Sequence, residues 1–137
     1  MTPPERHPST DPHEWLSRAR SNLTQARNRL PGIYLEDLCF NAQQAAEKAL
    51  KGVLLSRDVE FPYVHDLAHL LHLLESHGEP IPPDVRRVGR LTPYAVATRY
   101  PGPGVPVSEA QYLEALEIAE TVVHWAATLL HGSSAEL

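Results

Sequence analysis

The 137-residue chain has little cysteine and few large aromatic residues: one cysteine, Cys39, two phenylalanines and two tryptophans. A single cysteine cannot form a disulfide or a cysteine-based metal cluster within one chain, so the composition favours a reducing compartment. The longest apolar runs are only a few residues, and the N-terminal residues lack the apolar stretch of a signal peptide. We therefore expect a cytoplasmic protein with no membrane segment.

Positive charge is also scarce, with 12 Lys and Arg against 17 Asp and Glu and a formal net charge of −5. Non-specific phosphate binding needs a positive surface, so a general nucleic-acid coat protein is excluded, whereas a local basic patch is allowed. The four arginines between residues 18 and 29 are spread around their predicted helix, which favours a solvated surface. Some of them would face phosphate only if a second subunit deepened the groove. The sequence lacks a Gly-rich phosphate loop, a serine nucleophile elbow and a paired-carboxylate motif.

Hydrophobic residues make up 42% of the chain, enough for the core of one domain. They recur at helical spacing, and no segment shows the alternation of a strand. Capping signals begin the first helix, at Asp11, and the last, at Ser108. The pattern predicts an all-α antiparallel bundle of four to five helices over residues 11–131, with a disordered tail at 1–10 and a short tail at 132–137. The expected helices cover residues 12–30, 34–56, 65–76, about 84–91 and 108–131.

Three histidines invite a metal interpretation. His65, His69 and His72 recur at i, i+4 and i+7, which places them on one side of a helix. Two histidines four residues apart can bind zinc when a third ligand is available. All three nevertheless face away from the leucine stripe, without a His-Glu-x-x-His motif. We therefore prefer a hydrated polar face and expect neither a metal site nor a cofactor.

The stretch "ATRYPGPGVPVSEAQY" (residues 97–112) contains the best candidate site. Arg99 suits bidentate phosphate recognition, Tyr94 and Tyr100 offer rings for stacking, and the following prolines limit backbone freedom. Alternatively, Arg99 bonds a carboxylate or helix carbonyls, Tyr100 packs on the last helix, and the prolines only stop a helix. From these residues alone we favour this connector interpretation.

Two aromatic residues are candidates for a partner interface. Phe40 lies among polar residues of the second helix, where an exposed large aromatic suggests a partner surface. Trp125 belongs to a group that widens the apolar face of the last helix, so that helix is either central or shared with a second subunit. A structural dimerisation or partner-binding module is therefore one of the alternatives.

Three stretches together resemble the HEPN domain family: "CFNAQQAAEKALKGVLL" (39–55), "YVHDLAHLLHLL" (63–74) and "LTPYAVATRYP" (91–101). The resemblance spans residues 15–130. It implies a helical bundle that is commonly dimeric, often encoded beside a minimal nucleotidyltransferase, and assigned nucleotide or RNA binding. It also implies kinship with ribonuclease toxins of toxin–antitoxin pairs.

Those ribonucleases use an arginine followed, after four to six residues, by a histidine. Counting from Arg99, this chain has Gly104, Val105 and Pro106 where the histidine would stand. The Arg6 to His13 spacing fits but crosses the expected tail, and Arg57 to His65 is one residue too long. We therefore expect a phosphate-binding protein of the Arg-Tyr-Pro branch acting with a nucleotidyltransferase partner, with a metal-independent ribonuclease toxin as the alternative.

Overall fold

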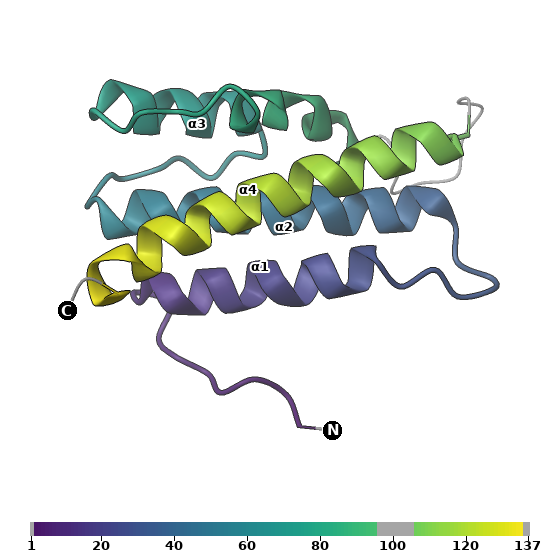
Figure 1. The fold of residues 1–137 in the computed structure, drawn as a ribbon, viewed down its shortest axis with the longest axis horizontal. Coiled ribbons are helices and arrows are strands. Elements are labelled where there is room, and N and C mark those ends of the chain that lie inside the picture. Colours follow the sequence, from purple (N-terminus) through teal and green to yellow (C-terminus); the bar gives the residue numbers. More distant parts are fainter. Residues whose placement is uncertain (1, 96–105, 136–137) are drawn as a thin grey trace.

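A computed structural model describes residues 2–95 and 106–135, with side chains as far as His131. These residues form helices and contain no strand, so the predicted all-α fold is confirmed (Figure 1). In the described part, no helix combines the length and apolar character needed to cross a membrane. The elements are α1 (Pro12–Ala26), α2 (Leu35–Ser56), α3 (Leu67–Ser76), the 3-10 helix η1 (Val85–Ala95) and α4 (Glu109–Ala135).

The predicted N-cap at Asp11 and the predicted capping box at Ser108 are confirmed, whereas the capping-box role expected of Glu14 was wrong, because Glu14 accepts from the backbone N–H of His7 instead of that of Asp11. The Asp11 carboxylate accepts a hydrogen bond from the backbone N–H of His13, with Pro12 at the first helical position. At the start of α4, Ser108 and Gln111 exchange two hydrogen bonds of 2.8 and 3.1 Å as a capping box. Each cap satisfies amide groups that have no partner inside the helix, and so fixes where the helix begins.

Four predicted helix limits were wrong, and the last helix ends at Ala135 rather than at residue 131. The first helix ends at Ala26 rather than at residue 30. The third begins at Leu67 rather than at His65, because the Asp66 side chain caps it by accepting from Ala68 and His69. The fourth is a 3-10 helix that continues to Ala95, beyond the predicted end at about residue 91. The hydroxyl of Thr92 in this extension accepts from the backbone N–H of Leu67 at 3.1 Å.

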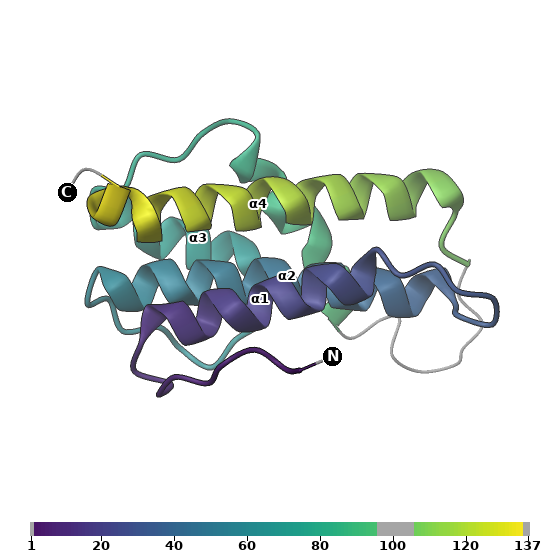
Figure 2. The same ribbon diagram turned by 60° about the horizontal axis from the view of Figure 1, so that its bottom comes forward.

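α2 lies at the centre of the bundle and contacts every other helix. Figures 1 and 2 show α1 and α4 beside it, with α3 and η1 covering another side. The alanines on its inner face are fully buried, and such small side chains let helices approach closely. This packing leaves one outer face of α2 to carry polar residues. The buried alanines of this face are Ala42, Ala45, Ala46 and Ala49.

Gly52 of α2 lies where the start of α1 and the end of α4 meet. A Cβ atom there would lie 3.2 Å from the Cβ of Trp15 and 3.3 Å from the backbone oxygen of Pro12. We expect Gly52→Val to lower the free energy of unfolding by about 1–3 kcal/mol, because its methyl groups overpack this junction. Gly89→Ala is the control, since its added Cβ would make only an ordinary 3.5 Å contact. Equal urea midpoints for the two variants would contradict this prediction.

Candidate functional site

The outer face of α2 carries a row of polar and aromatic side chains along the helix. At 100° per residue, Glu36, Phe40, Gln43, Glu47 and Lys51 fall within a strip roughly 80° wide. The backbone N–H of Val107, just before α4, donates to Glu36 at 2.9 Å. The row therefore begins beside the segment that leads into α4 and ends near the C-terminus of α2.

A buried charged cluster occupies the second half of this row. The Glu47 carboxylate accepts from Gln43 Nε2 at 2.9 Å and from Lys51 Nζ at 2.9 Å. The Nδ1 atom of His65 lies 2.8 Å from the same carboxylate. Glu47, Lys51 and Gln43 are all buried, whereas the His65 side chain is 46% exposed. The cluster thus links the interior of the fold to one imidazole at the surface.

The hydrogen bonds of this cluster control the ionisation of Glu47. Burial by itself would raise the pKa of the carboxyl, but the hydrogen bonds from His65, Lys51 and Gln43 outweigh burial and hold the pKa below its usual value. Glu47 is therefore an anion at neutral pH and keeps Lys51 and His65 oriented toward it.

Residues 57–66, between α2 and α3, cover this cluster. The ammonium of Lys51 lies 5.7 Å from the ring centroid of Phe61 and 5.6 Å from that of Tyr63. The Phe61 ring also makes an edge contact with Trp15 of α1, with centroids 5.9 Å apart. We call Phe61 to His65 the aromatic arm. Two helices therefore hold it in place: α1 through Trp15, and α2 through Lys51 and Glu47.

A second polar network joins α2 to α1. Lys48 Nζ donates to the Asn22 side chain at 2.7 Å, and Asn22 donates to Asn41 at 3.1 Å. Burial lowers the pKa of Lys48, and the positive charges of Arg18 and Lys51 lower it further. This network extends the polar face of α2 to the edge of α1.

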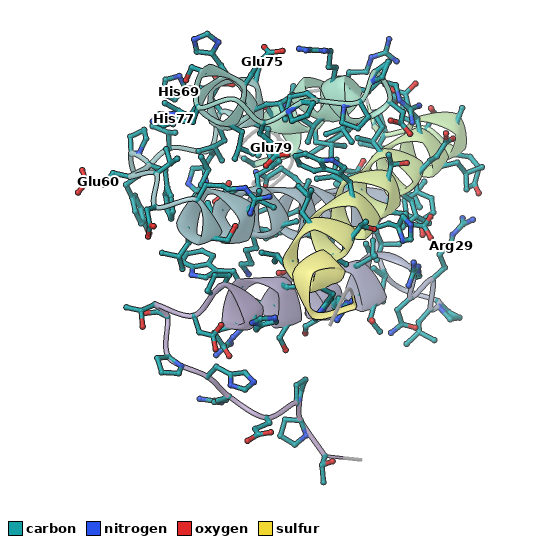
Figure 3. The ribbon with its side chains drawn as sticks, turned by 60° about the vertical axis from the view of Figure 1, so that its left-hand side comes forward. Arg29, Glu60, His69, Glu75, His77 and Glu79 are labelled. Carbon is teal, nitrogen blue, oxygen red and sulfur yellow. The ribbon has the colours of Figure 1, made fainter. Side chains whose placement is uncertain are left out.

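Most arginines of the described residues are neutralised by carboxylates. Seven of them pair with glutamates: Arg18 with Glu14, Arg27 with Glu120, Arg29 with Glu109, Arg57 with Glu79, Arg86 with Glu75, Arg87 with Glu117 and Arg90 with Glu114. Figure 3 labels Arg29 and the acceptors Glu75 and Glu79. Arg57 therefore faces Glu79 rather than His65. The arginines with no such partner among the described residues are Arg6 and Arg20.

The predicted phosphate site falls only partly within the structure. Arg99 and Tyr100 lie outside the described residues. Tyr94, at the end of η1, is partly buried and packs against the core, and burial raises the pKa of its hydroxyl. The Tyr94 side chain is therefore only partly accessible to a ligand.

Phe40 and Trp125, the two residues predicted to form a partner interface, do not form a fully exposed patch. Phe40 was expected to be exposed but is partly buried, three residues before the fully buried Gln43 in the same row of α2. Trp125 is also partly buried and packs against the core from α4. α4 contacts α1, α2 and η1, and part of its apolar surface, such as Leu113, stays exposed.

The predicted histidine row is broken at its first member. His69 and His72 are exposed on α3, while His65 precedes the helix and turns toward Glu47 (Figure 3 labels His69). No three His, Cys, Asp or Glu side chains within the described ranges are arranged to hold a metal ion.

Cys39 is buried, and burial together with the nearby Glu36 raises the pKa of its thiol to about 12, so it is not a nucleophile at neutral pH.

Sequence reasoning missed the pairing of Glu47 with His65. As an i, i+4 pair of opposite charge on the polar side of the helix, Glu47 and Lys51 would be expected to be solvated. They are instead buried, and the Lys51 ammonium lies 5.7 Å from the ring centroid of Phe61. The available signal was the two aromatic residues, Phe61 and Tyr63, in the stretch just before His65.

Comparison with known proteins agrees with this architecture. Residues 12–129 match the HEPN domain. The chain belongs to the HEPN domain family. The crystal structure of TT1696 from Thermus thermophilus is 33% identical, with a TM-score of 0.70 over 85% of this chain and 95% of that one.

A second solved structure is similar to this HEPN domain. ST0689, an archaeal HEPN homologue, is 28% identical, with a TM-score of 0.71 over 88% of this chain and 98% of that one. No curated protein matches the sequence at a significant level. The matched region includes the whole of α1, α2, α3 and η1, and therefore the buried Glu47 cluster.

Proposed function

We propose that this HEPN domain protein binds the phosphates of a nucleotide or an RNA through Arg99, with Tyr100 and Tyr94 beside it. The observation that carries the proposal is the neutralisation of seven other arginines by glutamates. An arginine already held by a carboxylate has less to gain from a phosphate, because the two anions compete for the same donors. Arg99 therefore stands among the few arginines left as candidates.

Arg20 is the strongest competitor among the described residues. It is exposed and lies in a shallow groove between α1 and α4 that is also lined by Arg27, Glu120 and His124. Glu120 already binds Arg27 there, at 2.7 Å, and its negative charge opposes a phosphate. We therefore assign the phosphate to Arg99 rather than to Arg20.

Arg99→Ala is expected to weaken binding of a fluorescent single-stranded RNA by roughly 10-fold and to reduce the slope of log K against log salt by about 1. Anisotropy titrations at several salt concentrations measure both quantities. Arg90→Ala is the matched control, because Arg90 is already paired with Glu114. Unchanged binding by Arg99→Ala would remove it from the site, and loss of binding by Arg20→Ala instead would place the site in the α1–α4 groove.

We further propose that the protein is a cytoplasmic homodimer acting with a nucleotidyltransferase protein, in a pair of the toxin–antitoxin type. The support is membership of the HEPN domain family and the partly accessible, broad apolar face of α4 around Trp125. Light scattering of the purified protein, alone and with a nucleotidyltransferase encoded beside it, tests this. A monomeric mass in both samples would contradict it.

A further inference from the structure

We infer that Tyr63 and His65 form a stacking subsite for one base of a single-stranded RNA. This inference rests on the proposed function and extends it, because it adds a base contact, made by other residues, to the proposed phosphate contact. It also restricts the expected ligands from any phosphate compound to nucleic-acid chains with unpaired bases.

Tyr63 is the most exposed of the large hydrophobic side chains described, at 96%. The Lys51 ammonium lies 5.6 Å from its ring centroid, yet that contact leaves nearly the whole ring accessible to solvent. An accessible tyrosine ring is a platform on which any nucleobase can stack, because every base has a π face.

His65 lies next to this ring, with ring centroids 6.4 Å apart. Its Nδ1 atom is directed at the buried carboxylate of Glu47, so Nε2 lies on the opposite edge of the imidazole. Neutral His65 with its proton on Nδ1 would accept a hydrogen bond at Nε2, and protonated His65 would donate one. The subsite thus combines a stacking surface with one polar atom for the base or its sugar.

The buried charges of Glu47 and Lys51 beneath the aromatic arm are the strongest indication that the position of the arm is important for function. A buried ion pair contributes little net stability, since the loss of hydration offsets the attraction. Glu47 and Lys51 are both on α2, so their bond joins no two helices. Outside α2, these two side chains contact the imidazole of His65 and the rings of Phe61 and Tyr63. The pair therefore serves to fix the aromatic arm.

The negative charges around Tyr63 favour a base over a phosphate at this subsite. Glu60 and Asp66, which directly precede and follow the aromatic arm, are exposed, and Glu60 projects outward from the fold in Figure 3. These carboxylates disfavour a phosphate beside Tyr63. Stacking supplies the binding energy here, and stacking depends weakly on salt. Changes at Tyr63 should accordingly alter affinity without altering the salt dependence.

The ligand must also be long enough. From Glu36, which binds the backbone just before α4, to Lys51 beneath Tyr63 there are 15 residues of α2, or about 22 Å at 1.5 Å per residue. A mononucleotide is shorter than this span of α2. An oligomer of several nucleotides can cover it, and both ends of the span lie on the same row of α2.

The test compares Tyr63→Ala with wild type, using a labelled single-stranded oligoadenylate and an abasic oligomer of the same length and charge. Tyr63→Ala should bind oligoadenylate roughly 5- to 100-fold more weakly, with an unchanged salt slope, and should bind the abasic oligomer as wild type does. Tyr63→Trp should restore binding, with its indole fluorescence quenched by the bases. Tyr34→Ala is the matched control, because Tyr34 is 74% exposed but lies before α2.

The outcomes separate this inference from the proposed function. Wild-type binding that is equal for the two oligomers and unaffected by Tyr63→Ala would overturn the stacking subsite and leave the phosphate site standing. Absence of wild-type binding to either oligomer would overturn both. Loss of a protein partner in Tyr63→Ala, with RNA affinity unchanged, would show that the arm contacts protein and would also overturn the inference.

Discussion

Lys51→Met is expected to lower the free energy of unfolding by about 3–5 kcal/mol, because it leaves the buried Glu47 carboxylate without its cation. Both side chains are less than a tenth exposed, so solvent does not compensate for the loss. Urea denaturation at pH 7 measures the change. Lys48→Met is the matched control from the same helix, since Lys48 is only partly buried and donates to the neutral Asn22. We expect it to change stability by no more than about 1 kcal/mol.

The pH dependence of the free energy of unfolding, compared between wild type and Lys51→Met, identifies the cause of the lost stability. In wild type the pKa of Glu47 is below its ordinary value, so its contribution to stability is complete above the pKa of an unfolded glutamate and is lost as pH falls through the folded pKa. In Lys51→Met the same carboxyl loses a stabilising donor, and its protonation relieves the unpaired charge. The difference in free energy of unfolding between wild type and Lys51→Met should therefore shrink as the pH falls from 7 to 4. A deficit that is constant with pH would mean that lost packing, not charge, is the cause.

A double variant completes the test of the buried pair. Replacing Glu47 and Lys51 together, as Glu47→Gln with Lys51→Met, removes both charges and should recover most of the stability that Lys51→Met loses. The double variant should nevertheless hold the aromatic arm less firmly. Its RNA affinity is then expected to stay below that of wild type even where its stability is restored.

Tyr112→Ala is expected to lower the free energy of unfolding by about 3–5 kcal/mol. Tyr112 is the largest of the fully buried side chains, and its hydroxyl donates to the backbone oxygen of Ala26 at 2.8 Å. That oxygen belongs to the last turn of α1, where helical carbonyls have no partner within the helix. The guanidinium of Arg29 also lies 5.2 Å from the Tyr112 ring centroid. One side chain thus holds the first turns of α4 against the end of α1.

Leu113→Ala is the control for this prediction, because the neighbouring Leu113 is 52% exposed. It should change stability by about 0.5 kcal/mol or less. Tyr112→Phe keeps the ring and removes only the hydroxyl, so a loss of about 1–2 kcal/mol is expected. Thermal or urea unfolding of the three variants gives the comparison. Similar losses for Tyr112→Ala and Leu113→Ala would show that α4 is not anchored through this residue.

The helices could be predicted because their signals are local. Asp11 with Pro12, and Ser108 with Gln111, determine helix starts through hydrogen bonds over two or three residues. The end of α1 could not be predicted in this way. Leu30 continues the apolar spacing of the helix, but the chain leaves the helix after Ala26, whose oxygen is bound by Tyr112 from a distant part of the sequence.

The candidate site was only partly predictable for the same reason. Spacing alone placed Glu47 and Lys51 as neighbours on α2, and they are. Their contacts outside α2 come from Phe61, Tyr63 and His65, which the chain brings back beside α2 after the turn that ends the helix. His65 belongs to the predicted histidine row by spacing, but the Asp66 cap starts α3 after it and lets its ring turn to Glu47.

The measurement that tests the central claim most directly is photo-crosslinking of a 4-thiouridine-substituted single-stranded RNA to the wild-type protein, followed by mass spectrometry of the crosslinked peptides. RNA binding through Arg99, with a base held at the aromatic arm, predicts crosslinks in the peptides that contain Tyr63 and Tyr100. Crosslinks confined to the exposed surface of α3 or to the α1–α4 groove around Arg20, or no crosslink at saturating protein, would contradict it.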